Sequence, residues 1–135
     1  MNLHLRAAIL WIVIVFCYFI HGYYHLAELF FGMDIKIPDA QGHVPVATHL
    51  FSVFVEILPL SIGVATLFIS GKWFVWTAFV FSILFALLNL VHLAMTIFKE
   101  AGDIRQIALL GLIMVVNILL VSDISKQRKR IKNVF

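Results

Sequence analysis

Charged residues are scarce in this sequence. Only 13% of its 135 residues are Asp, Glu, Lys or Arg, whereas 63% are hydrophobic. Soluble domains are about half apolar and about a quarter charged, so this composition excludes an ordinary soluble domain. It predicts an integral membrane protein, and the length suits one domain that spans residues 1–135.

Cysteine and catalytic motifs are scarce as well. The single cysteine, Cys17, cannot form a disulfide within the chain, and its apolar surroundings suit a small hydrophobic side chain. The sequence contains neither a glycine-rich phosphate loop nor a nucleophile elbow. Five of the ten Lys and Arg residues lie in the stretch SKQRKRIK near the C-terminus. Nothing else makes a basic surface, so we expect no nucleic-acid partner.

Long apolar runs dominate the chain instead. A transmembrane helix needs about 20 mostly apolar residues. Four segments meet this length, at residues 7–31, 46–70, 73–98 and 107–124. Their mostly short connections predict an all-α fold, an integral membrane antiparallel four-helix bundle with both termini on the same side. Within the second span, Pro59 lacks a backbone N–H and predicts a kink of the helix about one turn past Glu56.

Lys and Arg are distributed unevenly between the two sides of this bundle. Seven lie on the side of the termini: Arg6, Lys72, Lys126, Arg128, Lys129, Arg130 and Lys132. Three lie on the other side: Lys36, Lys99 and Arg105. Because cytoplasmic segments carry an excess of Lys and Arg, we expect both termini to be cytoplasmic, in a cytoplasmic-type membrane. Residues 125–135 are then a basic cytoplasmic tail that contacts anionic lipid.

Polar side chains recur at helical spacing in all four spans. His21, His25 and Glu28 are spaced i, i+4 and i+7, which puts them on one face of the first span. The other polar positions are Tyr18, His49, Ser52, Glu56, Ser82, Asn89, His92, Thr96, Gln106 and Asn117. Because burial of an unpaired charge in a bilayer is costly, we expect these side chains to face the bundle interior.

The ionisable side chains also fall at similar depths. Counted at a rise of about 1.5 Å per residue, His25 and His92 lie about 9 Å below the outer ends of their spans. One turn deeper, a second level holds His21, Glu56 and Asn89. These groups therefore gather in the outer half of the bundle.

This gathering predicts a site for a divalent transition metal. Imidazole and carboxylate ligands without thiolate suit zinc, iron or copper. The predicted ligands are His21, His25, Glu56 and His92, with His49 and Glu28 as optional ligands. Three further side chains are expected to hold a ligating imidazole in place through hydrogen bonds: Tyr18, Asn89 and Asn117.

This ligand set fits either a metal carrier or an intramembrane metalloenzyme. In an enzyme, Glu56 is the candidate general base that takes a proton from a metal-bound water. Two other interpretations stay open. His25 and His92 would be the axial ligands of a haem b in the bundle core. Alternatively, the polar groups line a pocket for a lipid or small molecule, or join the helices of an accessory subunit in a homo-oligomer or larger membrane complex.

Overall fold

Long helices make up the protein in a computed structural model that describes residues 2–34, 42–99 and 101–132. The elements in chain order are α1 (Leu3–Ala27), the 3-10 helix η1 (Glu28–Phe31), α2 (Val46–Ser52), the π turn η2 (Val53–Ile57), α3 (Leu58–Phe68), α4 (Lys72–Lys99) and α5 (Ile104–Lys132). No strand occurs in these ranges. Lys36, which was counted for the topology, and residues 133–135 of the basic tail lie outside them.

Four helical segments are long and apolar enough to cross a membrane, which confirms the number of candidate spans. They are Leu3–Phe31, Val46–Phe68, Lys72–Lys99 and Ile104–Ile131. The first and last run further than predicted. In particular, the basic residues 125–132 continue α5 as helix and do not begin a separate segment.

The second span contains the π turn η2 just before Pro59, whereas the sequence predicted a kink about one turn past Glu56. In η2 the N–H of Leu58 bonds to the carbonyl of Val53, five residues earlier. Pro59 has no N–H to offer the carbonyl of Val55, so a regular helical ladder cannot pass through this point. The wider π turn absorbs the interruption without ending the helix.

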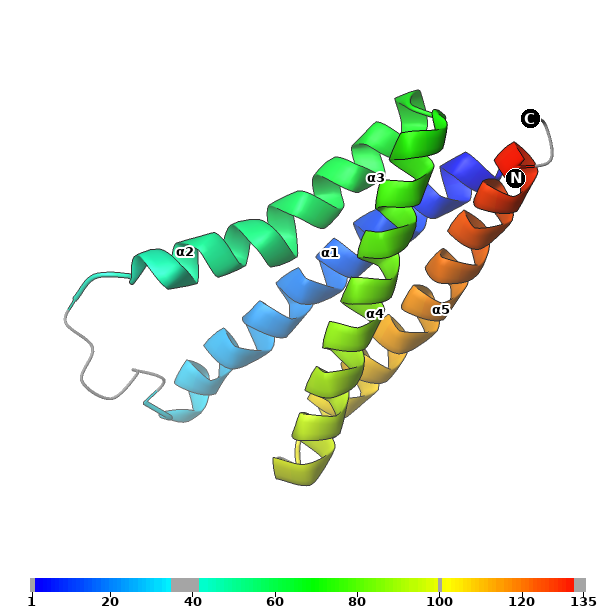
Figure 1. Ribbon diagram of the computed structural model, residues 1–135. Helices are drawn as coiled ribbons and strands as arrows, with labels where there is room; N and C mark the ends of the chain where they lie inside the picture. The colour runs from blue at the N-terminus through cyan, green and yellow to red at the C-terminus, as the bar shows by residue number, and fades with distance from the viewer. Residues whose placement is uncertain (1, 35–41, 100, 133–135) are drawn as a thin grey trace.

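The helices pack around α1, which contacts α3 on one side and α5 on the other, while α4 packs along α5. Figure 1 shows both termini at one end of the molecule, together with the connection from α3 to α4. We name this the terminal end. At the opposite end, the loop end, α2 and α5 begin and α4 finishes. Toward the loop end α2 diverges from α4, and its residues 46–51 are exposed.

Large side chains fill the interior between α1, α3 and α4. Trp11 and Phe85 are fully buried and meet edge to face, with ring centroids 5.7 Å apart. Phe54 stacks on the other side of Phe85 at 5.5 Å. A Cβ atom at Gly63 would lie only 2.8 Å from the Cβ of Trp11. Glycine therefore allows α3 to approach α1 this closely.

Polar contacts join α1 to α5 at the terminal end. Asp123 is 0% exposed, and its carboxylate lies 2.9 Å from Nε of Arg6 and 3.8 Å from Nζ of Lys126. Gln127 donates a hydrogen bond of 2.9 Å to the carbonyl of Leu3. A buried carboxylate is thus surrounded by opposite charge, and this contact fixes the two helices against each other.

Candidate functional site

Three histidines meet near the loop end. His21 and His25 are one turn apart on α1, with their Nε2 atoms 3.2 Å from each other and their rings nearly perpendicular. His92 comes from α4 and packs edge to face against His21, with ring centroids 5.0 Å apart. The structure therefore brings together three of the four predicted ligands.

A fourth side chain, Gln106, was missed as a site residue. It lies in the first turn of α5 and is 3% exposed, and its Nε2 atom is 3.4 Å from both Nδ1 of His21 and Nε2 of His25. Asp103 accepts a hydrogen bond from the Gln106 backbone N–H and so caps α5 at this point. The polar spacing of the last span included Gln106, but spacing alone does not reveal which helix α5 contacts.

We call His21, His25, His92 and Gln106 the histidine cluster. A cavity of about 280 Å³ adjoins it, lined by His25, His92, Met95, Thr96, Lys99 and Gln106. Within the described part of the chain, the buried Oε1 atom of Gln106 has no hydrogen-bond partner. Imidazole, hydroxyl, amide and ammonium groups therefore surround a space large enough for several water molecules or a small solute.

The predicted acidic ligands stand apart from the cluster or at its edge. The Glu28 carboxylate lies 4.0 Å from Nδ1 of His25, at the start of η1. Glu56 is half-buried in η2 and has no hydrogen bond or ion pair with any other described residue. His49 is exposed on α2. The second span diverges from the other helices at this depth. Glu56 and His49 therefore do not contact the histidine cluster, although their predicted depths are similar.

The described residues form no metal-holding group of acidic, thiol and imidazole side chains. Among residues 2–34, 42–99 and 101–132, no set of three or more His, Cys, Asp and Glu side chains is arranged to hold a metal ion. In this arrangement the predicted four-ligand site of His21, His25, Glu56 and His92 is therefore not assembled.

The side chains expected to orient the histidines have other partners. Tyr18 donates a hydrogen bond to Oδ1 of Asn89 at 3.0 Å, and Nδ2 of Asn89 lies 2.8 Å from the Tyr18 hydroxyl oxygen. Asn117 donates to the carbonyl of Ile113 on its own helix. Gln106 contacts the histidines in their place.

The contacts between α1 and α4 differ by one turn from the predicted levels. His92 meets His21, where His25 was expected, and Asn89 meets Tyr18, where His21 was expected. The prediction counted both helices from a common outer boundary. The side-chain contacts do not follow that count, so the outer ends of the two helices do not share one height.

Comparison of the whole chain with protein-family models, with curated proteins and with solved structures finds no match in any of the three.

Proposed function

We propose that the chain crosses a membrane as an antiparallel four-span bundle with cytoplasmic termini, and that its histidine cluster binds a divalent transition metal. The four apolar helices and the excess of Lys and Arg at the terminal end support the membrane topology. Under this topology the cluster lies in the outer half of the bundle. Zinc, copper and iron are the candidate ions, because the available ligands are nitrogen and oxygen atoms.

The observation that carries the proposal is the distance of 3.2 Å between the Nε2 atoms of His21 and His25. Two imidazole nitrogens bound to one tetrahedral zinc at 2.0–2.1 Å lie about 3.3 Å apart. Without a metal, one of these nitrogens must donate a proton to the other. With a metal bound between them, both nitrogens would present lone pairs to the ion.

Gln106 supports this role by controlling the tautomer of His21. Nδ1 of His21 faces the Gln106 amide, while Nε2 faces His25. The two ends of an amide are assigned from hydrogen bonding, and a rotated Gln106 amide would direct its unpaired oxygen at Nδ1. An Nδ1–H donor to that oxygen leaves the lone pair on Nε2, which is how proteins commonly orient a metal-binding histidine.

Two imidazoles leave coordination positions open toward the cavity of about 280 Å³. Water or a small solute can occupy these positions, as a carrier or an enzyme would need. Glu56 takes no part in this proposal, and its role as a base stays a prediction. The cavity is also smaller than the pockets of about 300–1,000 Å³ that hold drug-sized ligands, so the volume does not favour haem b.

The test uses the full chain purified in mild detergent without a histidine tag or chelator. Elemental analysis and the visible spectrum of the same sample are expected to give about one metal per chain and no Soret band. Zinc titration by calorimetry then compares His21→Ala, His25→Ala and His49→Ala, the last being the control because His49 is exposed on α2. The first two variants should lose at least about a hundredfold in affinity, and the control should bind like the wild type.

Other results would reject the metal site. If His49→Ala weakens zinc binding as much as His25→Ala does, the geometry of the cluster is not what binds the ion. If a metal-free sample takes up no zinc, the same cavity is left as a pocket for a small polar molecule. The side chains of Thr96 and Lys99, which line it, favour that second candidate.

A further inference from the structure

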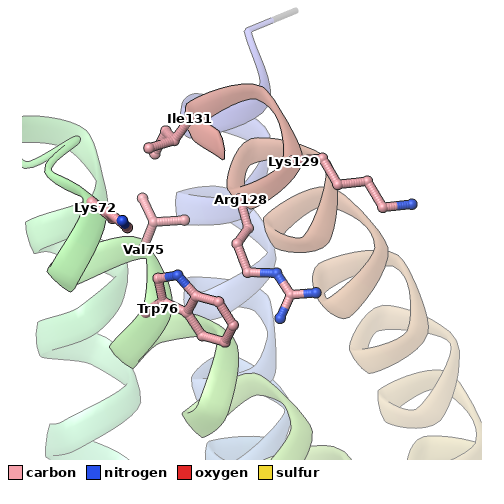
Figure 2. Close-up of a pocket in the computed structure, with 6 residues that line it drawn as sticks. All are labelled: Lys72, Val75, Trp76, Arg128, Lys129 and Ile131. Atoms are coloured by element: carbon pink, nitrogen blue, oxygen red, sulfur yellow. The ribbon is translucent and has the colours of Figure 1, made fainter. Parts of the chain in front are cut away.

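A second cavity lies at the terminal end, far along the helices from the histidine cluster. It has a volume of about 380 Å³ and opens between the start of α4 and the end of α5. Figure 2 shows its lining residues: Lys72, Val75, Trp76, Arg128, Lys129 and Ile131. Nothing in the proposed metal site accounts for it.

The lining is strongly cationic. Lys72, Arg128 and Lys129 contribute positive charge, and none of the described residues that line the cavity carries a carboxylate. Within the described residues, none of the three forms an ion pair with an acidic side chain. The neighbouring cations Arg6 and Lys126 differ, because both lie beside Asp123. Three cations around one hollow, with no acidic partner among the described residues, attract an anion.

Arg128 is held in place by two aromatic rings. Its guanidinium carbon lies 4.4 Å from the centroid of Trp76 and 4.0 Å from that of Phe79. In Figure 2 the Arg128 side chain reaches from α5 toward Trp76, whereas the ammonium of Lys129 points away from that ring. Stacking on rings engages the faces of a guanidinium and leaves its N–H edge free for acceptor oxygens. This edge matches the oxygens of a phosphoryl group.

Further donors and an apolar wall complete the cavity. Lys72 is the first residue of α4, where the helix dipole adds positive potential. Figure 2 shows the indole nitrogen of Trp76 on the edge of the ring nearer Lys72 and Val75. Val75 and Ile131 give the hollow an apolar side. The site therefore combines hydrogen-bond donors for an anion with apolar surface beside them.

We propose that this cavity, the basic pocket, binds a phosphoryl group, carried either by an anionic phospholipid headgroup or by a soluble phosphate. Arg128 and Lys72 contact the phosphoryl oxygens, and Lys129 adds charge at the rim. Trp73, beside the pocket in sequence, is 87% exposed and suits the interfacial region of a bilayer. The proposal is independent of metal binding by the histidine cluster.

The experiment titrates the full chain in non-ionic detergent with two separate probes, short-chain phosphatidylglycerol and inorganic phosphate, and follows binding by calorimetry. Lys72→Gln and Arg128→Gln are each expected to weaken binding about fivefold, which corresponds to about 1 kcal/mol per charge. Arg130→Gln is the matched control, because it removes one charge from the same helix without lining the pocket. It should change affinity less than twofold.

The two probes distinguish the sources. Saturable binding of phosphatidylglycerol that phosphate does not displace supports a lipid headgroup. Saturable binding of phosphate that phosphatidylglycerol does not displace supports a soluble phosphate. Lys72→Gln keeps the ring contacts of Arg128, so it tests the pocket even if Arg128→Gln disturbs folding. An equal loss in Arg130→Gln would assign the binding to diffuse charge on the helix and overturn the proposal. So would wild-type affinity in Lys72→Gln, or the absence of binding to either probe.

Discussion

The two ends of this protein use polar side chains in different ways. At the terminal end, the buried Asp123 is neutralised by Arg6 and Lys126, and α3 packs tightly on α1 through Gly63. At the loop end, imidazole rings are gathered mainly with one another, beside a cavity and next to a span that diverges. Opposite charges in contact favour one fixed arrangement. Imidazole groups that surround a cavity are stabilised most by a ligand that several of them can bind at once.

The largest expected effect comes from removing the buried charge at the terminal end. Asp123→Asn leaves Arg6 and Lys126 without a counter-charge, and we expect it to lower the free energy of unfolding by about 2 kcal/mol. Unfolding in detergent, followed by circular dichroism, measures it. Asp103→Asn at the opposite end of α5 is the control, since Asn caps a helix as well as Asp does. Equal losses in both variants would remove the contrast between the two ends.

The next effect concerns protons at the loop end. A metal and a proton compete for the same imidazole lone pair, and a free imidazole titrates near pH 6.5. Zinc affinity should therefore be highest above neutral pH and fall progressively once the pH drops below about 6. Calorimetric titrations at several pH values measure the trend. Affinity that stays constant over this interval would show that imidazoles do not bind the ion.

A smaller effect is expected between the two ends, where Tyr18 and Asn89 join α1 to α4. Tyr18→Phe removes the hydroxyl and leaves the buried Asn89 amide unpaired, at a cost of about 1 kcal/mol. The matched control is Tyr23→Phe on the same helix, because Tyr23 is 61% exposed. Thermal unfolding of both variants should show a lower midpoint for Tyr18→Phe alone. A shift of the same size in Tyr23→Phe would count against a stabilising hydrogen bond.

The smallest effect should come from the exposed cation of the loop end. Arg105 lies 3.9 Å from the Asp103 carboxylate and 5.3 Å from the centroid of Tyr24, and its side chain is 54% exposed. Solvent screens such contacts, so Arg105→Gln should change the free energy of unfolding by less than about 0.5 kcal/mol. The same unfolding assay applies. A loss as large as that of Asp123→Asn would mean that charge pairing at the loop end has been underestimated.

The candidate spans could be predicted from the sequence, because a long apolar segment in a membrane must satisfy its own backbone hydrogen bonds and so forms a helix. The sequence predicted the four candidate spans, which are present, and a kink at Pro59, where the structure has a π turn just before the proline. Spacing on a single helix also identified His21 and His25 as neighbours, and they are in contact. Each of these predictions needs only the geometry of one helix.

Contacts between helices could not be predicted in the same way. His49 and Glu56 were assigned to the site by helical spacing and by depth, and neither carries information about whether two helices touch. Gln106 was missed because its contact with His21 depends on how α5 starts and on which neighbour it packs against. The predicted relative height of α1 and α4 also differs by one turn from the contacts that His21 and Tyr18 make with α4.

The π turn of the second span has a consequence for helical phase. A π turn contains about one residue more than a regular turn, and one residue corresponds to about 100° of rotation about the helix axis. A polar stripe counted from His49 through Ser52 to Glu56 assumes an unbroken period of 3.6 residues, but η2 interrupts that period. The second span thus consists of two half-helices with separate azimuths. α3 directs Gly63 at α1, whereas residues 46–51 of α2, His49 among them, are all exposed.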